Sequence, residues 1–253
     1  MADPLSSSRY SIEHAKRHID NLEREIVAFL RSKPYTVVIE TNAQCTEDSH
    51  KVKLTKPMPV TLPGIAFDAL NNLRPALDQA GYAVALATGK VRPNDAHFPF
   101  GKNAADVQHR IKGRSKDLPK EIFDVMVSFE PYETGKGLLW ALNELCNTHK
   151  HELVIPCALA TGGGTLKHAF FDALHAFTWP PQWDTAKQEM EIARVPYGAT
   201  PSYNFQVQTF IALGKVKRVE RQPADGILNA MLREVESVVM AVEAEARRLG
   251  LFI

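Results

Sequence analysis

Apolar residues recur at steps of three and four in three long stretches of the chain. The first stretch forms a seam of Ile12, Ala15, Ile19, Leu22, Ile26 and Phe29. The second lies between Pro63 and Gly89, and the third begins after Pro223 and ends at Gly250. This spacing places apolar side chains on one face of a helix. We therefore predict a helical core made of residues 1–33, 63–155 and 223–250, with the first and last helices packed together.

Two other regions have the alternation that is typical of strands. Residues 35–58 contain a β-branched run and an alternating segment, which predicts a two-stranded ribbon. Residues 166–213 contain further segments of period two, whereas the glycine-rich residues 161–165 favour a flexible connector. The expected fold class is α+β in a single domain of residues 1–253. We expect a helix-rich bundle with a β-ribbon and a small antiparallel sheet.

Two of the expected helices carry a row of polar residues beside the apolar stripe. The rows are Asn71, Arg74 and Asp78 in the first helix, and Trp140, Glu144, Asn147 and His151 in the second. Side chains three and four residues apart lie along one side of a helix. If the two helices pack with these rows facing, Arg, Asp, Glu, Asn and His gather in one partly buried place. Arg74 and Asp78 are also spaced for an ion pair within their helix.

Composition narrows the classes of function. The 253 residues are 45% hydrophobic and include 30 basic and 29 acidic residues, a net charge of +1. This balance argues against a strongly electrostatic nucleic-acid binder or a basic membrane-surface protein, and it leaves a local basic patch open. Three cysteines do not form a disulfide framework, and the first ten residues lack the apolar region of a signal peptide. We expect a cytoplasmic protein without a membrane partner.

Several motifs resemble a known family in the same order along most of the chain. They are residues 68–79, Phe98-Pro99-Phe100, Glu130-Pro131-Tyr132, Leu139-Trp140 and residues 144–151. Together they resemble a widespread family of uncharacterised bacterial and phage proteins. The segment Asn72-Leu73-Arg74 is similar to the start of the Arg-x4-6-His motif of HEPN ribonuclease folds, and Asn147 with Lys150-His151 is similar to a second HEPN-like motif, Asn-x-x-Lys-His.

The resemblance implies a HEPN-like helical bundle that binds RNA or a nucleotide phosphate. In HEPN ribonucleases two protomers pair, no metal or cofactor is needed, and Arg holds the scissile phosphate while His moves the 2′-hydroxyl proton. The catalytic positions implied here are Arg74, Gln79 and His151, and the substrate-binding positions are Asn71, Asp78, Glu144, Asn147 and Lys150. Gln79 stands at the histidine position, and an amide is no base near neutral pH. The resemblance thus implies a homodimer that is either a degenerate ribonuclease of a defence or toxin–antitoxin type or a binding module without catalysis.

Two alternatives come from the residues themselves. A small-molecule or metal-dependent enzyme would use Glu144 and the histidines of residues 140–152. His149 and His151 point roughly 200° apart on a helix, so His97 or His109 would have to join one of them, and we expect no bound metal. The second alternative is a structural partner-binding protein in which Arg74 pairs with Glu144 or Asp78. The thiols of Cys146 and Cys157 lie in apolar contexts that favour an inert role.

Overall fold

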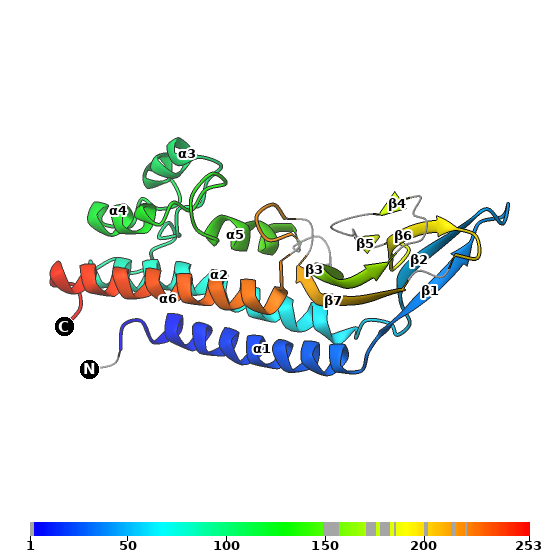
Figure 1. Ribbon diagram of the computed structural model, residues 1–253. Coiled ribbons are helices and arrows are strands. Elements are labelled where there is room, and N and C mark those ends of the chain that lie inside the picture. Colours follow the sequence, from blue (N-terminus) through cyan, green and yellow to red (C-terminus); the bar gives the residue numbers. More distant parts are fainter. Residues whose placement is uncertain are drawn as a thin grey trace.

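Long helices form one end of the molecule and strands form the other (Figure 1). The computed structural model describes residues 3–148, 157–170, 176–177, 183–184, 186–199, 202–213, 216–220 and 222–253. Its helices are α1 (Ser6–Arg31), α2 (Thr61–Ala87), α3 (Ala104–His109), α4 (Lys120–Ser128), α5 (Leu139–Thr148) and α6 (Ala224–Arg248), with a 3-10 turn η1 (Arg110–Lys112). The mixture of helices and antiparallel strands confirms the α+β fold class. None of the helices in these ranges is both long and apolar enough to cross a membrane.

The three longest helices pack side by side, and the contact between α1 and α6 is the one that their matching seams predicted. α1 contacts both α2 and α6, and α6 also packs on α2, α4 and α5. Polar contacts connect the same helices, because the Ser8 hydroxyl donates to the Ala76 carbonyl oxygen at 2.9 Å and Arg9 pairs with Glu243 at 2.6 Å. The seams of α1 and α6 are buried inside the chain. They therefore offer no free surface to a second copy, and the homodimer stays a prediction.

The ribbon predicted in residues 35–58 belongs to a larger antiparallel sheet. β1 (Tyr35–Thr41) pairs with β2 (Glu47–Leu54), which pairs with β6 (Glu189–Pro196). The short strands β4 (Ala176–Phe177) and β5 (Trp183–Asp184) also pair with β6. The sheet order is β1-β2-β6-β4, with β5 on β6. Strand β1 is therefore one edge of the sheet.

A second antiparallel pair corrects one expectation. β3 (Cys157–Phe170) pairs with β7 (Ser202–Leu213), and residues 161–165 lie inside β3 instead of forming a flexible connector. The register shifts between Thr161 and Gly164, where the glycines lie. Glycine is common at such bulges because the ladder is locally irregular there. The backbone hydrogen bonds offered by β7 thus outweigh the weak strand preference of glycine.

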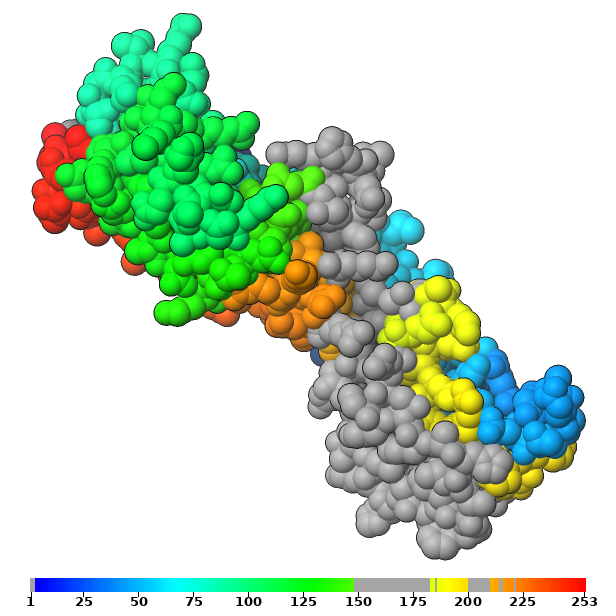
Figure 2. All heavy atoms as spheres, turned by 90° about the horizontal axis from the view of Figure 1, so that it is seen from above, coloured from blue at the N-terminus to red at the C-terminus, as the bar shows by residue number. Residues whose placement is uncertain are grey.

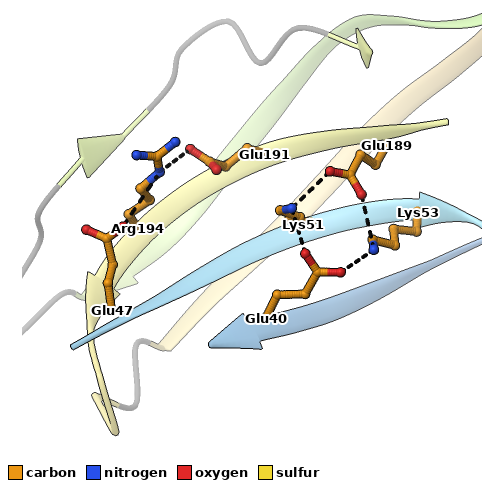
Figure 3. A network of polar contacts seen from close by, with 7 residues as sticks. All are labelled: Glu40, Glu47, Lys51, Lys53, Glu189, Glu191 and Arg194. Carbon is orange, nitrogen blue, oxygen red and sulfur yellow. Dashed lines mark hydrogen bonds and ion pairs between the residues drawn. The ribbon is translucent and has the colours of Figure 1, made fainter. Parts of the chain in front are cut away.

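Alternation gives the larger sheet one charged face. Lys51 Nζ lies 2.6 Å from a Glu40 carboxylate oxygen and 2.9 Å from one of Glu189 (Figure 3). Lys53 also pairs with both glutamates, at 3.1 Å to Glu189. These hydrogen bonds, from Lys51 first and Lys53 second, lower the pKa of Glu40 to about 2. The adjacent Val52 points to the opposite face, into a buried apolar cluster.

Candidate functional site

Arg74 is held in one orientation between α2 and α5. Its Nε donates to Asn143 Oδ1 at 3.1 Å, and its Nη1 lies 2.5 Å from Asp78 Oδ2. The guanidinium carbon lies 4.6 Å from the centre of the Phe100 ring, within cation–π distance. These contacts come from α2, α5 and the loop that follows α2, and none of them uses Nη2. The guanidinium is therefore held through Nε and Nη1 and can donate to a ligand from Nη2.

Asp78 connects three groups at this site. One of its oxygens faces both Arg74 and His97 Nδ1, the latter at 3.4 Å. Its other oxygen accepts the Phe98 backbone N–H at 2.8 Å. The ion pair within α2 agrees with the spacing of Arg74 and Asp78, whereas the contacts with His97 and Phe98 come from a loop about twenty residues later. Asp78 thus attaches this loop to α2 and turns His97 toward Arg74.

The loop that carries His97 is fixed by its own backbone contacts. The His97 N–H donates to the Arg114 carbonyl oxygen at 2.9 Å, and the Ser115 hydroxyl donates to the His97 carbonyl oxygen at 2.8 Å. The loop also lies directly on α2 at Gly81, where an added Cβ would come within 2.3 Å of the Ala96 carbonyl oxygen. Any larger residue at Gly81 would push the loop away. The position of His97 is therefore set before any ligand binds.

Two adjoining hollows open beside Arg74. Their volumes are about 280 and 330 Å³, and both are lined by Arg74, His97, Arg114 and Asn147. The first is completed chiefly by Phe100, Lys102, Arg110, Trp140, Asn143 and Glu144. The second is completed chiefly by Phe67, Asn71, Pro75, Asp78 and Cys146. Pro75 has no N–H, so α2 leaves the Asn71 carbonyl without its usual intrahelical donor at this hollow.

Positive charge predominates in the first hollow. Arg74, Lys102, Arg110 and Arg114 line it, and among the described residues of its lining Glu144 is the one acidic side chain. Arg110 donates from Nε to the Phe100 carbonyl oxygen at 2.9 Å, which directs its side chain toward the hollow. Several guanidinium groups near aromatic rings suit a ligand that carries both an anionic group and a planar one.

Most of the residues selected from the sequence meet here. Asn71, Arg74, Asp78, Glu144 and Asn147 all line one or both hollows, because α2 and α5 pack with their polar rows facing. Lys150 and His151, together with His149, lie outside the described residues.

The structure does not bring Gln79 to this site. Its side chain faces α1, where its Oε1 accepts the Ser11 hydroxyl at 2.9 Å. It lines a different groove, beside Tyr82 and Phe252. Gln79 follows Arg74 by five residues, which turns it by roughly 140° around the helix axis. The motif spacing alone therefore does not place these two side chains together.

Sequence reasoning missed three of the basic residues that line the first hollow. Lys102, Arg110 and Arg114 come from a segment after α2, and the accumulation of basic residues between positions 102 and 116 was the available signal. It missed Asn143 because this residue lies one position away from the polar row of its helix. The sequence indicates His97 only as a candidate metal ligand, and its contact with Asp78 depends on the path of a loop.

The residues described around the two hollows provide little for a metal or a reactive thiol. Within the ranges given above, no three or more His, Cys, Asp or Glu side chains are grouped to hold a metal ion. The buried thiol of Cys146 donates to the Leu70 carbonyl oxygen at 3.5 Å. This is the environment of a packed core cysteine.

Comparisons with known proteins assign no family to this chain. No family model, curated protein or solved structure matches it. The resemblance to HEPN folds therefore stays a prediction, and the chemistry of the two hollows is what bears on function.

Proposed function

We propose that this chain binds a phosphate-bearing ligand, a nucleotide or RNA, in the hollows around Arg74. The observation that carries this proposal is the fixed guanidinium of Arg74 in a hollow that is also lined by Arg110, Arg114 and Lys102. Guanidinium groups match phosphate oxygens in geometry and charge, and a donor that is already oriented loses little entropy when it binds.

The remaining lining suits the rest of a nucleotide. Trp140 provides aromatic surface, and a nucleobase can stack on such a surface whatever its identity. Asn147 lines both hollows, and its amide can donate to or accept from a base edge or a ribose hydroxyl. Volumes of about 280 and 330 Å³ are near the lower end of the roughly 300–1,000 Å³ that is common for ligand pockets. Each hollow is therefore suited to one nucleotide-sized group.

Binding can be tested with uridine monophosphate (UMP) and uridine by isothermal titration calorimetry. We expect UMP to bind and uridine, which lacks the phosphate, to bind at least tenfold more weakly. Arg74→Ala should weaken UMP binding by about 10- to 100-fold, because a hydrogen bond to a charged group contributes about 1.5–3 kcal/mol. Arg17→Ala on α1 is the control, since Arg17 is exposed and pairs only weakly with Glu13. Equal binding of UMP and uridine would contradict the proposal.

A metal-independent ribonuclease is a second candidate, favoured by the position of His97. If the Nδ1–H of His97 faces Asp78, its Nε2 is left as a proton acceptor beside the Arg74 guanidinium. A 2′-hydroxyl that loses its proton to Nε2 can attack the adjacent phosphorus, while Arg74 stabilises the negative charge that develops. The bond from phosphorus to the 5′-oxygen then breaks, and the departing 5′-oxygen takes a proton from solvent, to which Nε2 later releases its own. His97 then has the role that the sequence resemblance gave to other positions.

Cleavage is tested by incubating the purified protein with mixed RNA, with and without a chelator. We expect cleavage that the chelator does not stop, 2′,3′-cyclic phosphate ends, and loss of activity in His97→Gln. Cleavage that persists in His97→Gln would exclude His97 as the base. Intact RNA in every sample would exclude the ribonuclease and leave the proposal of phosphate binding in place.

A further inference from the structure

A short segment beside the first hollow concentrates positive charge. Residues 102–116 include five basic residues, Lys102, Arg110, Lys112, Arg114 and Lys116, against the single acidic residue Asp106. The segment therefore has a net charge of +4 in a chain whose net charge is +1, so the rest of the chain has a net charge of −3. All five basic residues are exposed.

This segment, which we call the basic lobe, projects from the long helices. It contains α3 and η1, which are drawn in blue-green and stand away from α1 and α6 (Figures 1 and 2). Asn103 caps α3 by accepting the Asp106 N–H at 2.9 Å, and Asp106 accepts the Lys102 N–H at 3.3 Å. Asp106 therefore serves the local backbone, and no basic side chain of the described residues is paired with it.

Most of the charge on the basic lobe is not neutralised within the protein. Lys116 pairs with Asp95 at 2.8 Å. Lys102, Lys112 and Arg114 form no ion pair with any residue in the described ranges. Lys102 and Arg114 also line the first hollow, whereas Lys112 does not. Positive charge thus continues from the hollow onto the outside of the lobe.

We propose that the basic lobe extends the Arg74 site and that the ligand is a single-stranded nucleic acid several nucleotides long. This inference rests on the proposed function. One nucleotide occupies a hollow, and the phosphates that flank it lie against Lys102, Arg114 and Lys112. A mononucleotide has too few charges to engage both the hollow and the lobe. A duplex keeps its bases stacked inside, whereas a single strand can place one base against Trp140.

Fluorescence anisotropy with a labelled octauridylate, measured over a series of salt concentrations, tests the proposal beside UMP calorimetry. We expect the octamer to bind more tightly than UMP and with a steeper salt dependence. Each phosphate contact that is lost should reduce the slope of log K against log salt by about 0.7 for a single strand. Lys112→Gln should therefore weaken octamer binding and flatten its slope by about this amount, with UMP binding unchanged. The control is Lys16→Gln, at an exposed lysine of α1.

The outcomes separate this inference from the proposed function. Octamer binding no tighter than UMP binding, or a Lys112→Gln variant that behaves like Lys16→Gln, overturns the extended site and leaves phosphate binding in place. Binding of neither ligand overturns both. If polyglutamate displaces the octamer as well as unlabelled RNA does at equal charge, the lobe is a docking surface for an acidic protein, and the inference is wrong.

Discussion

Replacing Arg74 by alanine tests how the candidate site is held together. The change removes the bond to Asn143, the ion pair with Asp78 and the contact with the Phe100 ring. The side chains of Arg74 and Asp78 are 24% and 27% exposed, so the pair is neither fully buried nor open to water. A hydrogen bond to a charged group contributes about 1.5–3 kcal/mol and a cation–π contact about 0.5–1 kcal/mol.

The expected loss is smaller than the sum of these contacts. Asp78 keeps its bond from the Phe98 N–H, and water can reach it through the adjoining hollow. Removing one partner of a fully buried ion pair lowers the free energy of unfolding by roughly 3–5 kcal/mol, and the loss expected for Arg74→Ala is therefore smaller than this. We expect Arg74→Ala to lower the free energy of unfolding by about 2 kcal/mol, given these partial compensations.

Urea unfolding at pH 7, followed by circular dichroism, measures this loss against a matched control. Arg17→Ala also removes an Arg–carboxylate pair at positions i and i+4, but its partners are 68% and 56% exposed and 3.7 Å apart. Exposed pairs of this kind contribute about 0–1 kcal/mol. The difference between the two variants therefore reports the tertiary contacts of Arg74.

Two results would refute this account. A loss for Arg74→Ala no larger than that for Arg17→Ala would mean that Arg74 is not fixed as described. A loss of about 3–5 kcal/mol with UMP binding unchanged would make Arg74 a structural residue. The proposed function requires a moderate loss of stability together with a large loss of affinity.

Three further changes test other parts of the structure. Asp78→Asn keeps an oxygen for the Phe98 N–H but loses the charge that holds Arg74 and His97. Amide hydrogen exchange of residues 96–101 should therefore accelerate. Unchanged exchange would show that Asp78 does not fix the loop. The pKa of Glu40 is lowered from 4.5 to about 2 in the folded protein, so its stabilising contribution is present above pH 4.5 and is lost as the pH falls toward 2. The urea midpoint of Glu40→Gln should therefore depend less on pH over that range than the midpoint of the unaltered chain. Equal dependence would contradict the ion-pair network. Burial raises the pKa of Glu234, whose carboxylate accepts the Leu138 N–H at 2.6 Å, so its stabilising contribution is present below pH 4.5 and is lost as the pH rises through the raised pKa. The melting temperature of Glu234→Gln minus that of the unaltered chain should therefore be larger at pH 8 than at pH 4. A difference that does not depend on pH would argue against a carboxylate whose charge is disfavoured by burial.

Local spacing was enough to identify the helices and part of the site. The seam from Ile12 to Phe29 predicted α1, and its counterpart after Pro223 predicted α6, because a step of three or four residues repeats one helical face. The pairing of Arg74 with Asp78 followed from the same geometry, since the two positions are one turn apart. The polar rows of α2 and α5 likewise indicated which faces meet.

Spacing could not predict the contacts made by loops and by distant segments. Whether residues 161–165 form a connector or a strand depended on the partner strand β7, which lies about forty residues away in the sequence. The motif assigned Gln79 to the site, although five residues turn it roughly 140° away from Arg74 around α2. Its contact with Ser11 of α1 depends on how the two helices pack.

The basic side of the site was decided by tertiary structure alone. The sequence determined that residues 102–116 are basic and that His97 lies in a loop, and nothing local states that either lies beside Arg74. Their positions result from the contact of the loop with Gly81 and from the bonds that His97 makes with Arg114, Ser115 and Asp78. Periodicity specifies which face of an element is apolar, but the neighbours of a polar side chain depend on long-range packing, which has no period in the sequence.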